Sequence, residues 1–226
     1  MNIRDFRKPE YNVDEIFLNR WSPRAMSGEE INEKTLFELF EAARWAPSAN
    51  NNQPWRFVFV DDPVKLVEMR AVFTSTNAWA HAASMIIVVF SRKEDDCVIK
   101  DREYHLFGCG LATGFLVLRA TELGLVAHPI AGFSPKKTRE ILGIPDAYQV
   151  TSLILVGRKA EALNPVMTPK QIAEEMTRPA RFPLDRFVFR NAFRLLRNSG
   201  IGRLQRQRGN FTRCYSSVIG AHFLPI

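Results

Sequence analysis

Two arginines and a serine alternate near the start of the chain, in the pattern Arg20-x-Ser22-x-Arg24. In an extended segment, residues two apart point to the same side, so these three side chains can face one ligand. A guanidinium is a rigid fork of donors that suits a phosphate or another electron-rich group. The pattern therefore favours an anion-binding segment, and the alternative is a surface turn whose arginines pair with acids.

The segment from Ala46 to Phe57 is rich in prolines and side-chain amides. Between its two prolines lie Ser48, the asparagines 50–52 and Gln53. Proline ends a helix, and a cluster of amides can hydrogen-bond the edge of a planar, uncharged ligand such as a flavin. The alternative is an ordinary turn from a helix into the apolar run that starts at Phe57.

Two motifs in the second half of the chain extend this pattern. Residues 123–133 read Leu-Gly-Leu-Val-Ala-His-Pro-Ile-Ala-Gly-Phe and are followed by Ile-Leu-Gly-Ile-Pro at 141–145 and an apolar run at 153–157. Arg-Phe-Pro follows at 181–183. With the arginine–serine pattern and the Pro-Ser-x-x-Asn-x-Gln-Pro-Trp loop, these motifs resemble the nitroreductase family of FMN-dependent oxidoreductases, over residues 14 to 184.

The resemblance implies a non-covalent FMN, NAD(P)H as co-substrate and an intertwined homodimer. It assigns Arg20, Ser22 and Arg181 to the phosphate, and Arg24 to the flavin edge at N1 and O2. It brings the backbone N–H groups at Ala131 and Gly132 near N5 and O4, and it implies no catalytic side chain because the flavin carries the chemistry. The expected cofactor-binding residues are Arg20, Trp21, Ser22, Arg24, Pro47, Ser48, Ala49, Asn51, Gln53, Asn77, Pro129, Ile130, Ala131, Gly132 and Arg181.

The same resemblance implies that the loop residues Pro47, Ser48 and Asn51 come from the other subunit. The implied reaction is hydride transfer from NAD(P)H through FMN to a small-molecule acceptor, such as a nitroaromatic, a quinone or an enone. A specialised enzyme of the same superfamily (a dehalogenase or a dehydrogenase) and a non-catalytic flavin-binding protein are the alternatives. No nicotinamide motif separates NADH from NADPH.

Composition limits the class of protein. The chain has 226 residues, of which 46% are hydrophobic, enough for a packed core. Its three cysteines are widely spaced and its four histidines form no zinc pattern, so we expect no disulfide and no metal. The N-terminus lacks the apolar stretch of a signal peptide. These features favour a cytoplasmic protein.

The net charge of +7 is concentrated at the C-terminal end. Residues 178–226 hold ten arginines, no lysine and one acid, a net charge of +9, and the rest of the chain has a net charge of −2. We therefore expect a nitroreductase-like FMN-binding domain over residues 1–184 and an arginine-rich extension over 185–226. The spacing of Arg186, Arg190, Arg194 and Arg197 predicts a basic amphipathic helix that could dock on a membrane, a nucleic acid or the sister subunit.

Apolar periodicity predicts strands that alternate with helices, which favours an α/β or α+β sandwich. The resemblance specifies an α+β fold, a nitroreductase-like sandwich whose central, mostly antiparallel sheet is flanked by helices. The predicted strands are 56–60, 85–90, 126–130 and 152–156. The predicted helices are 13–20, one from a Ser27–Glu30 capping box to Arg44, 64–72, 102–122, 135–142 and one that starts at Thr168-Pro169 with Gln171 in the capping box.

The helix predicted over 102–122 is apolar nearly all round. Such a helix is buried on more than one side, which makes it a central helix or a dimer seam. Its Gly108, Gly110 and Gly114 do not fit the spacing of a dinucleotide-binding fingerprint, so we assign these small residues to close helix packing.

Overall fold

A computed structural model describes residues 3–177 and 180–193. The chain divides into two units, Met1–Phe182 and Pro183–Ile226, which are described separately below. The predicted functional boundary between residues 184 and 185 stays a prediction.

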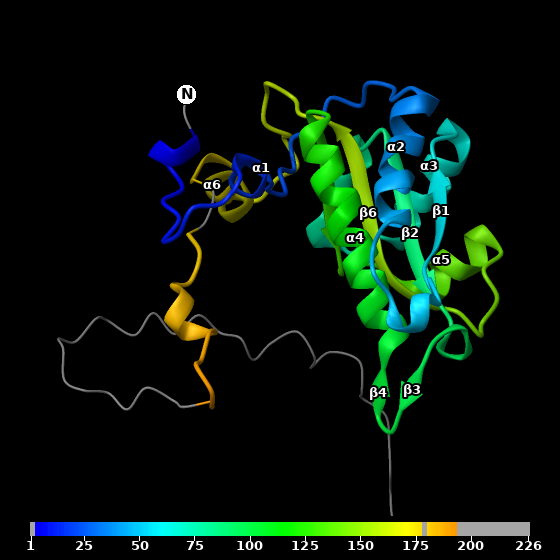
Figure 1. The fold of residues 1–226 in the computed structure, drawn as a ribbon. Helices are drawn as coiled ribbons and strands as arrows, with labels where there is room; N and C mark the ends of the chain where they lie inside the picture. Colours follow the sequence, from blue (N-terminus) through cyan, green and yellow to red (C-terminus); the bar gives the residue numbers. More distant parts are fainter. Residues whose placement is uncertain (1–2, 178–179, 194–226) are drawn as a thin grey trace, which may run out of the picture. The chain divides into compact units, whose positions relative to one another are not determined.

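The first unit is built on a four-stranded sheet in the order β1-β2-β6-β5 (Figure 1). The strands are β1 Arg56–Val60, β2 Met85–Ser91, β5 Leu125–Ile130 and β6 Gln149–Arg158. Every pair of neighbours is antiparallel. All four strands were predicted, and the predicted sheet is confirmed; β6 extends beyond its prediction at both ends.

Helices cover both faces of this sheet (Figure 1). On one face, α2 Glu33–Arg44 and α4 Tyr104–Glu122 pack on Ile87 and Ile154. On the other face, α3 Pro63–Met69 and the 3-10 segment η4 Ser75–Ala82 bury Met69 and Trp79 against Val88 and Leu155, beside α5 Pro135–Leu142. Successive residues of β2 alternate between the two cores, which explains why this strand is apolar from Met85 to Phe90.

The remaining elements are short or lie outside these layers. They are η1 Ile3–Asp5, α1 Glu15–Asn19, η2 Ala49–Asn51, η3 Arg70–Val72, η5 Lys93–Asp95, β3 Val98–Ile99, β4 Arg102–Glu103 and α6 Pro169–Thr177. Among the described residues, no helix is long and apolar enough to cross a membrane.

Two helices follow their sequence signals closely. Helix α5 starts after Ser134, whose hydroxyl accepts from the Lys137 N–H at 3.3 Å, and ends at Gly143 with a φ of 64°. Helix α6 has the predicted capping box: the Thr168 N–H donates to the Gln171 side chain at 2.9 Å, and the Gln171 N–H donates to the Thr168 hydroxyl at 3.3 Å.

The predicted start of α2 was wrong. Ser27 does not cap this helix, because its N–H donates to the Arg158 carbonyl at 3.0 Å and Gly28 has a φ of 75°. The cap is Asn32, whose side chain accepts from the Thr35 N–H at 2.8 Å. The contact between Ser27 and the end of β6 joins residues that are far apart in the sequence, so no local pattern predicts it.

The predicted start of the apolar helix was also early. Arg102 and Glu103 form β4, which pairs with β3 in a small hairpin, and α4 starts at Tyr104. Of the three glycines, Gly108 packs closely, since a Cβ there would lie 3.1 Å from Pro54. Within the described residues, Gly110 and Gly114 have no such neighbour. They lie on an exposed stripe with Phe107 and Phe115, which are 64% and 39% exposed.

The second unit does not contain the predicted basic helix in its described part. Leu184–Arg186 form a 3-10 turn, η6, and residues 187–193 form a turn and bends. The Phe189 and Phe193 rings pack edge to face, with centroids 4.6 Å apart. The prediction of a helix was therefore wrong for residues 186–193. Arg194 and Arg197 lie outside the described residues.

Candidate functional site

The arginine–serine segment follows α1 and begins with an extended backbone at Arg20. Arg20 ends α1 with φ −62° and ψ 120°, and its guanidinium donates to the Ser22 hydroxyl at 3.3 Å. Arg7 holds the start of the segment, since its guanidinium donates to the Leu18 carbonyl at 2.7 Å and to the Arg20 carbonyl at 3.0 Å. The backbone that presents Arg20 is therefore fixed by a residue that no motif identified.

Arg20 and Arg181 bring two positive charges close together. Arg20 is half-buried, and burial, followed by the charge of Arg181, lowers the pKa of its guanidinium. Within the described part of the chain, neither side chain forms an ion pair with a carboxylate. Two cations gathered without an acid fit a doubly charged phosphate group.

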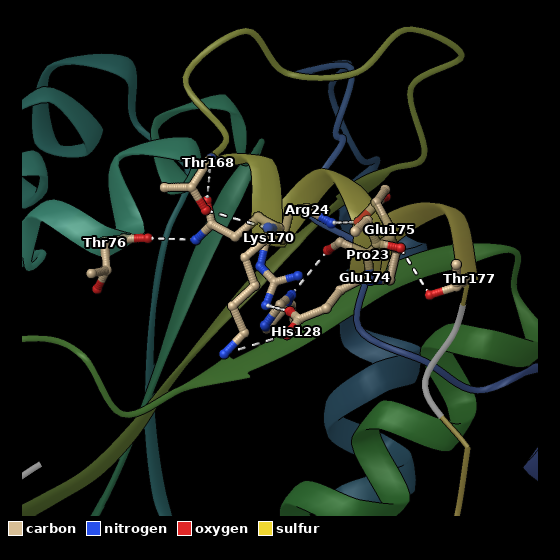
Figure 2. A network of polar contacts seen from close by, with 11 residues as sticks. Pro23, Arg24, Thr76, His128, Thr168, Lys170, Glu174, Glu175 and Thr177 are labelled. Atoms are coloured by element: carbon tan, nitrogen blue, oxygen red, sulfur yellow. Dashed lines mark hydrogen bonds and ion pairs between the residues drawn. The ribbon is translucent and has the colours of Figure 1, made fainter. Parts of the chain in front are cut away.

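Arg24 lies in a different environment (Figure 2). Its guanidinium pairs with the Glu174 carboxylate of α6 at 2.9 Å and lies 5.9 Å from the centre of the Trp79 ring. Its backbone N–H donates to the Glu175 carboxylate at 2.8 Å. No sequence motif predicted these two acids. The sequence indicates only that both lie on the helix predicted to start at Thr168-Pro169.

His128 joins β5 to the arginine segment (Figure 2). Its Nδ1–H donates to the Pro23 carbonyl at 2.9 Å, and its ring packs on Trp79 with centroids 4.6 Å apart. The pKa of His128 is lowered to about 4, chiefly by burial and also by the charges of Arg24 and Arg20, against the opposing effect of the Pro23 hydrogen bond. The imidazole is therefore neutral near neutral pH and packed in the interior rather than placed as an acid.

The turn after β5 presents two backbone donors. Within the described residues, the N–H groups of Ala131 and Gly132 donate no hydrogen bond. The Gly132 carbonyl accepts from the Asn77 amide at 2.9 Å and from the Thr74 hydroxyl at 3.1 Å. A Cβ at Gly132 would lie 2.6 Å from the Asn77 amide nitrogen and 2.8 Å from the Thr74 hydroxyl, so a larger residue would displace the side chains that hold this turn. The structure thus brings Asn77 to this turn, where Pro129 is half-buried and Ile130 belongs to the core.

The amide-rich loop is held by the turn that precedes the β3–β4 hairpin. The Asn50 amide donates to Cys97 Sγ and the Asn52 amide to the Asp96 carboxylate, both at 3.0 Å. Inside the loop, the Gln53 N–H donates to the Ser48 hydroxyl at 3.0 Å. Asn50, Asn51 and Gln53 have positive φ values of 49°, 57° and 51°. A loop held in this unusual conformation is typical of a binding site.

Within a single chain, the amide-rich loop lies apart from the segment that contains Arg20 and Arg24. The loop leads into β1 and the Ala131–Gly132 turn follows β5, which are the two outer strands of the sheet. Three strand spacings of about 4.8 Å separate β1 from β5 by about 14 Å. The predicted residues therefore form two groups. One contains Arg20, Trp21, Ser22, Arg24, Asn77, Pro129, Ile130, Ala131, Gly132 and Arg181, and the other contains Pro47, Ser48, Ala49, Asn51 and Gln53.

A cavity of about 570 Å³ lies between α3 and the start of β2. Its lining includes Gly28, Arg70 and His81, and none of the predicted cofactor residues. We give more weight to the arginine group, because it brings Arg20 close to Arg181 and, among the described residues, neither forms an ion pair with a carboxylate.

The chain matches the nitroreductase family over residues 18–78 and 67–158. A protein named NADH dehydrogenase from Thermus thermophilus is 29% identical over 186 residues, which cover 68% of this chain and 89% of the relative. A protein named putative NADH dehydrogenase/NAD(P)H nitroreductase from Archaeoglobus fulgidus is 31% identical over 151 residues, or 63% of this chain and 82% of the relative.

Solved structures agree with these matches. A crystal structure described as an oxidoreductase containing FMN is 33% identical, with a TM-score of 0.72 over 83% of this chain and 96% of its own. A nitroreductase family protein of Clostridium difficile 630 has a TM-score of 0.66 over 81% of this chain and 100% of its own. At 22% identity, the second likeness shows the fold alone.

Proposed function

The chain belongs to the nitroreductase family and is an oxidoreductase, and from this membership we propose that it binds FMN and uses NAD(P)H to reduce a small-molecule acceptor. FMN held by the predicted cofactor residues would supply hydride transfer between NAD(P)H and the acceptor. A nitroaromatic, a quinone or an enone has the electron-poor centre that accepts a hydride.

The observation that carries this proposal is the pair of cations at Arg20 and Arg181, which have no acid partner in the described part of the chain. We assign Arg20, Ser22 and Arg181 to the phosphate of FMN. The free N–H groups of Ala131 and Gly132 suit the acceptor atoms along the edge of the isoalloxazine ring. Arg24 supplies the cation near N1 and O2, and Asn77 holds the turn that carries the two N–H groups.

The amide-rich loop requires a second chain in this proposal. Residues Pro47, Ser48, Ala49, Asn51 and Gln53 would complete the cofactor site of a partner subunit, because they lie at the far edge of the sheet in their own chain. The exposed stripe on α4, with Phe107 and Phe115, is the surface we assign to the homodimer. An apolar stripe in this position favours a partner over water. The odd, widely spaced cysteines support a cytoplasmic enzyme.

Anaerobic reduction tests the proposed activity. Purified protein loaded with FMN should lose its flavin absorbance when NADH or NADPH is added, and regain it when a quinone or a nitroaromatic follows. The rates with NADH and NADPH would identify the preferred co-substrate. If the flavin stays oxidised with both nicotinamides, the proposed enzyme activity is contradicted, and the alternative of a non-catalytic flavin-binding protein is favoured.

A further inference from the structure

Two adjacent acids of α6, Glu174 and Glu175, both bind Arg24 (Figure 2). They are 150 and 151 residues away in sequence. They also lie beyond residues 18–158, which carry the family match. This contact is therefore a feature of this chain that the family match does not explain.

Glu175 fixes the backbone at Arg24. Its side chain is buried, with 7% exposure, and it accepts from the Arg24 N–H at 2.8 Å and from the Ala25 N–H at 3.4 Å. A buried carboxylate is costly unless donors surround it, and two backbone amides supply them here. Glu175 thus sets the position from which the Arg24 side chain leaves the backbone.

Glu174 holds the guanidinium itself. Its carboxylate lies 2.9 Å from Nη2 of Arg24, and the two side chains are 32% and 20% exposed. Arg24 has five N–H donors, so its other donors stay available to a ligand. The carboxylate also offsets part of the positive charge that Arg24 presents.

Helix α6 is anchored independently of this pair. Its capping box fixes the first turn, and the Gln171 amide donates to the Thr76 carbonyl at 2.8 Å, next to Asn77 (Figure 2). Lys170, one turn earlier on the same helix, lies 3.9 Å from Glu174. Because the contacts of Gln171 and Glu175 hold the helix before and after Glu174, the carboxylate of Glu174 is placed rather than free to follow Arg24.

We propose that Glu174 is a positioning residue that orients the guanidinium of Arg24 and offsets part of its positive charge at the flavin. The contact of the neighbouring Glu175 with the backbone at Arg24 holds Glu174 in place. This inference rests on the proposed binding of FMN. A cation near N1 and O2 stabilises the negative charge that reduction adds to the flavin. An anion paired with that cation reduces this effect, so Glu174 keeps the reduction potential of the bound FMN lower than Arg24 alone would set it.

The test is the reduction potential of FMN bound to the Glu174→Gln variant, which keeps the side-chain shape and removes the charge. We expect the preference of the protein for reduced over oxidised FMN to increase about tenfold, which raises a two-electron potential by about 30 mV. Glu140→Gln is the matched control, because Glu140 also forms an (i, i+4) pair with a lysine, 3.8 Å from Lys136, on another helix. The control should leave the potential unchanged.

The same substitution in an Arg24→Gln protein distinguishes an effect that acts through Arg24 from a direct electrostatic effect of Glu174 on the flavin. In an Arg24→Gln protein, adding Glu174→Gln should change the preference for reduced FMN less than threefold. An unchanged potential in the single variant, or a full tenfold effect without Arg24, would overturn the inference while FMN binding stands. Unaltered protein that takes up no FMN would overturn the proposed function as well.

Discussion

Arg20 and Arg181 are the residues that the account assigns most specifically, because both are placed at the phosphate. Replacing either with alanine should weaken FMN binding by about 1.5–3 kcal/mol, the range for a charge-assisted hydrogen bond. Riboflavin lacks the phosphate, so its binding should change much less. Titration of each variant with both ligands, followed by flavin fluorescence, measures the difference.

Arg139→Ala is a suitable control for these two variants, since Arg139 pairs with Asp146 on the surface at 3.2 Å. It should bind FMN and riboflavin as the unaltered protein does. Equal losses of FMN and riboflavin in Arg20→Ala or Arg181→Ala would show that the residue does not contact the phosphate.

His128 makes stability depend on pH at the same site. Its pKa is about 4 in the folded chain, below its usual 6.5. Between these values the unfolded chain binds a proton that the folded chain does not, so stability is complete above the unfolded pKa and falls as pH drops toward 4. The difference corresponds to a loss of about 3 kcal/mol at most.

Urea unfolding at about pH 7 and about pH 4.5 measures this loss. His128→Asn keeps a donor for the Pro23 carbonyl but does not titrate in this range. The variant should lose less stability than the unaltered protein on acidification. Parallel losses in the two proteins would show that His128 does not carry the effect.

At the residue scale, the sequence points to single residues where one local segment carries a motif. Arg20, Ser22 and Gly132 were selected from short motifs, and the structure gives each a position that suits a ligand; whether they bind FMN stays a prediction. Arg7, Glu174 and the link from His128 to Pro23 were missed. These contacts depend on how distant segments pack, and no local pattern encodes that packing.

At the scale of elements, the loop before β1 is the segment with the most unusual backbone. Asn51 has a φ of 57°, a conformation that costs most residues with a Cβ roughly 1–2 kcal/mol, costs asparagine less because its side chain can hydrogen-bond locally, and costs glycine nothing. Asn51→Ala should therefore lower the free energy of unfolding by about 1 kcal/mol. Asn51→Gly should lower it less, although both variants remove the same amide.

Chemical unfolding of the two variants tests this strain, and FMN titration tests the predicted contact of the Asn51 amide. If the amide binds the cofactor, both variants should lose the same affinity. Equal stability of Asn51→Ala and Asn51→Gly would contradict a left-handed backbone at this position.

Element boundaries were predictable where the cap is local. Ser134, Pro135 and Gly143 bound α5 as their types indicate. The start of α2 was missed because Ser27 bonds to the end of β6, a contact outside the expected element. The basic helix was predicted from the spacing of its arginines, but residues 186–193 form a turn and bends instead.

At the scale of the whole molecule, the proposed cofactor site requires residues from two chains. An obligate dimer usually buries more than about 2,000 Å². A charge within that area should separate the chains, so Phe107→Glu with Phe115→Asp should convert the dimer to a monomer. Because the loop that contains Asn51 would then be lost from the site, FMN should also dissociate.

Mass measured by light scattering, together with flavin content, tests this prediction. Val64→Asp is the control, since Val64 is 69% exposed on α3 and lies away from the α4 stripe. It should leave both mass and flavin content unchanged. If the unaltered protein is a monomer and still holds FMN, both the dimer interface on α4 and the cofactor site shared between two chains are contradicted.

The visible spectrum of the protein, recorded after incubation with FMN and removal of the excess, tests whether this chain is an FMN enzyme whose cofactor site contains Arg20, Arg181 and the turn after β5. We predict a yellow protein with flavin absorbance equal to one FMN per chain, released as FMN on acid denaturation. A colourless protein that retains no FMN would contradict it.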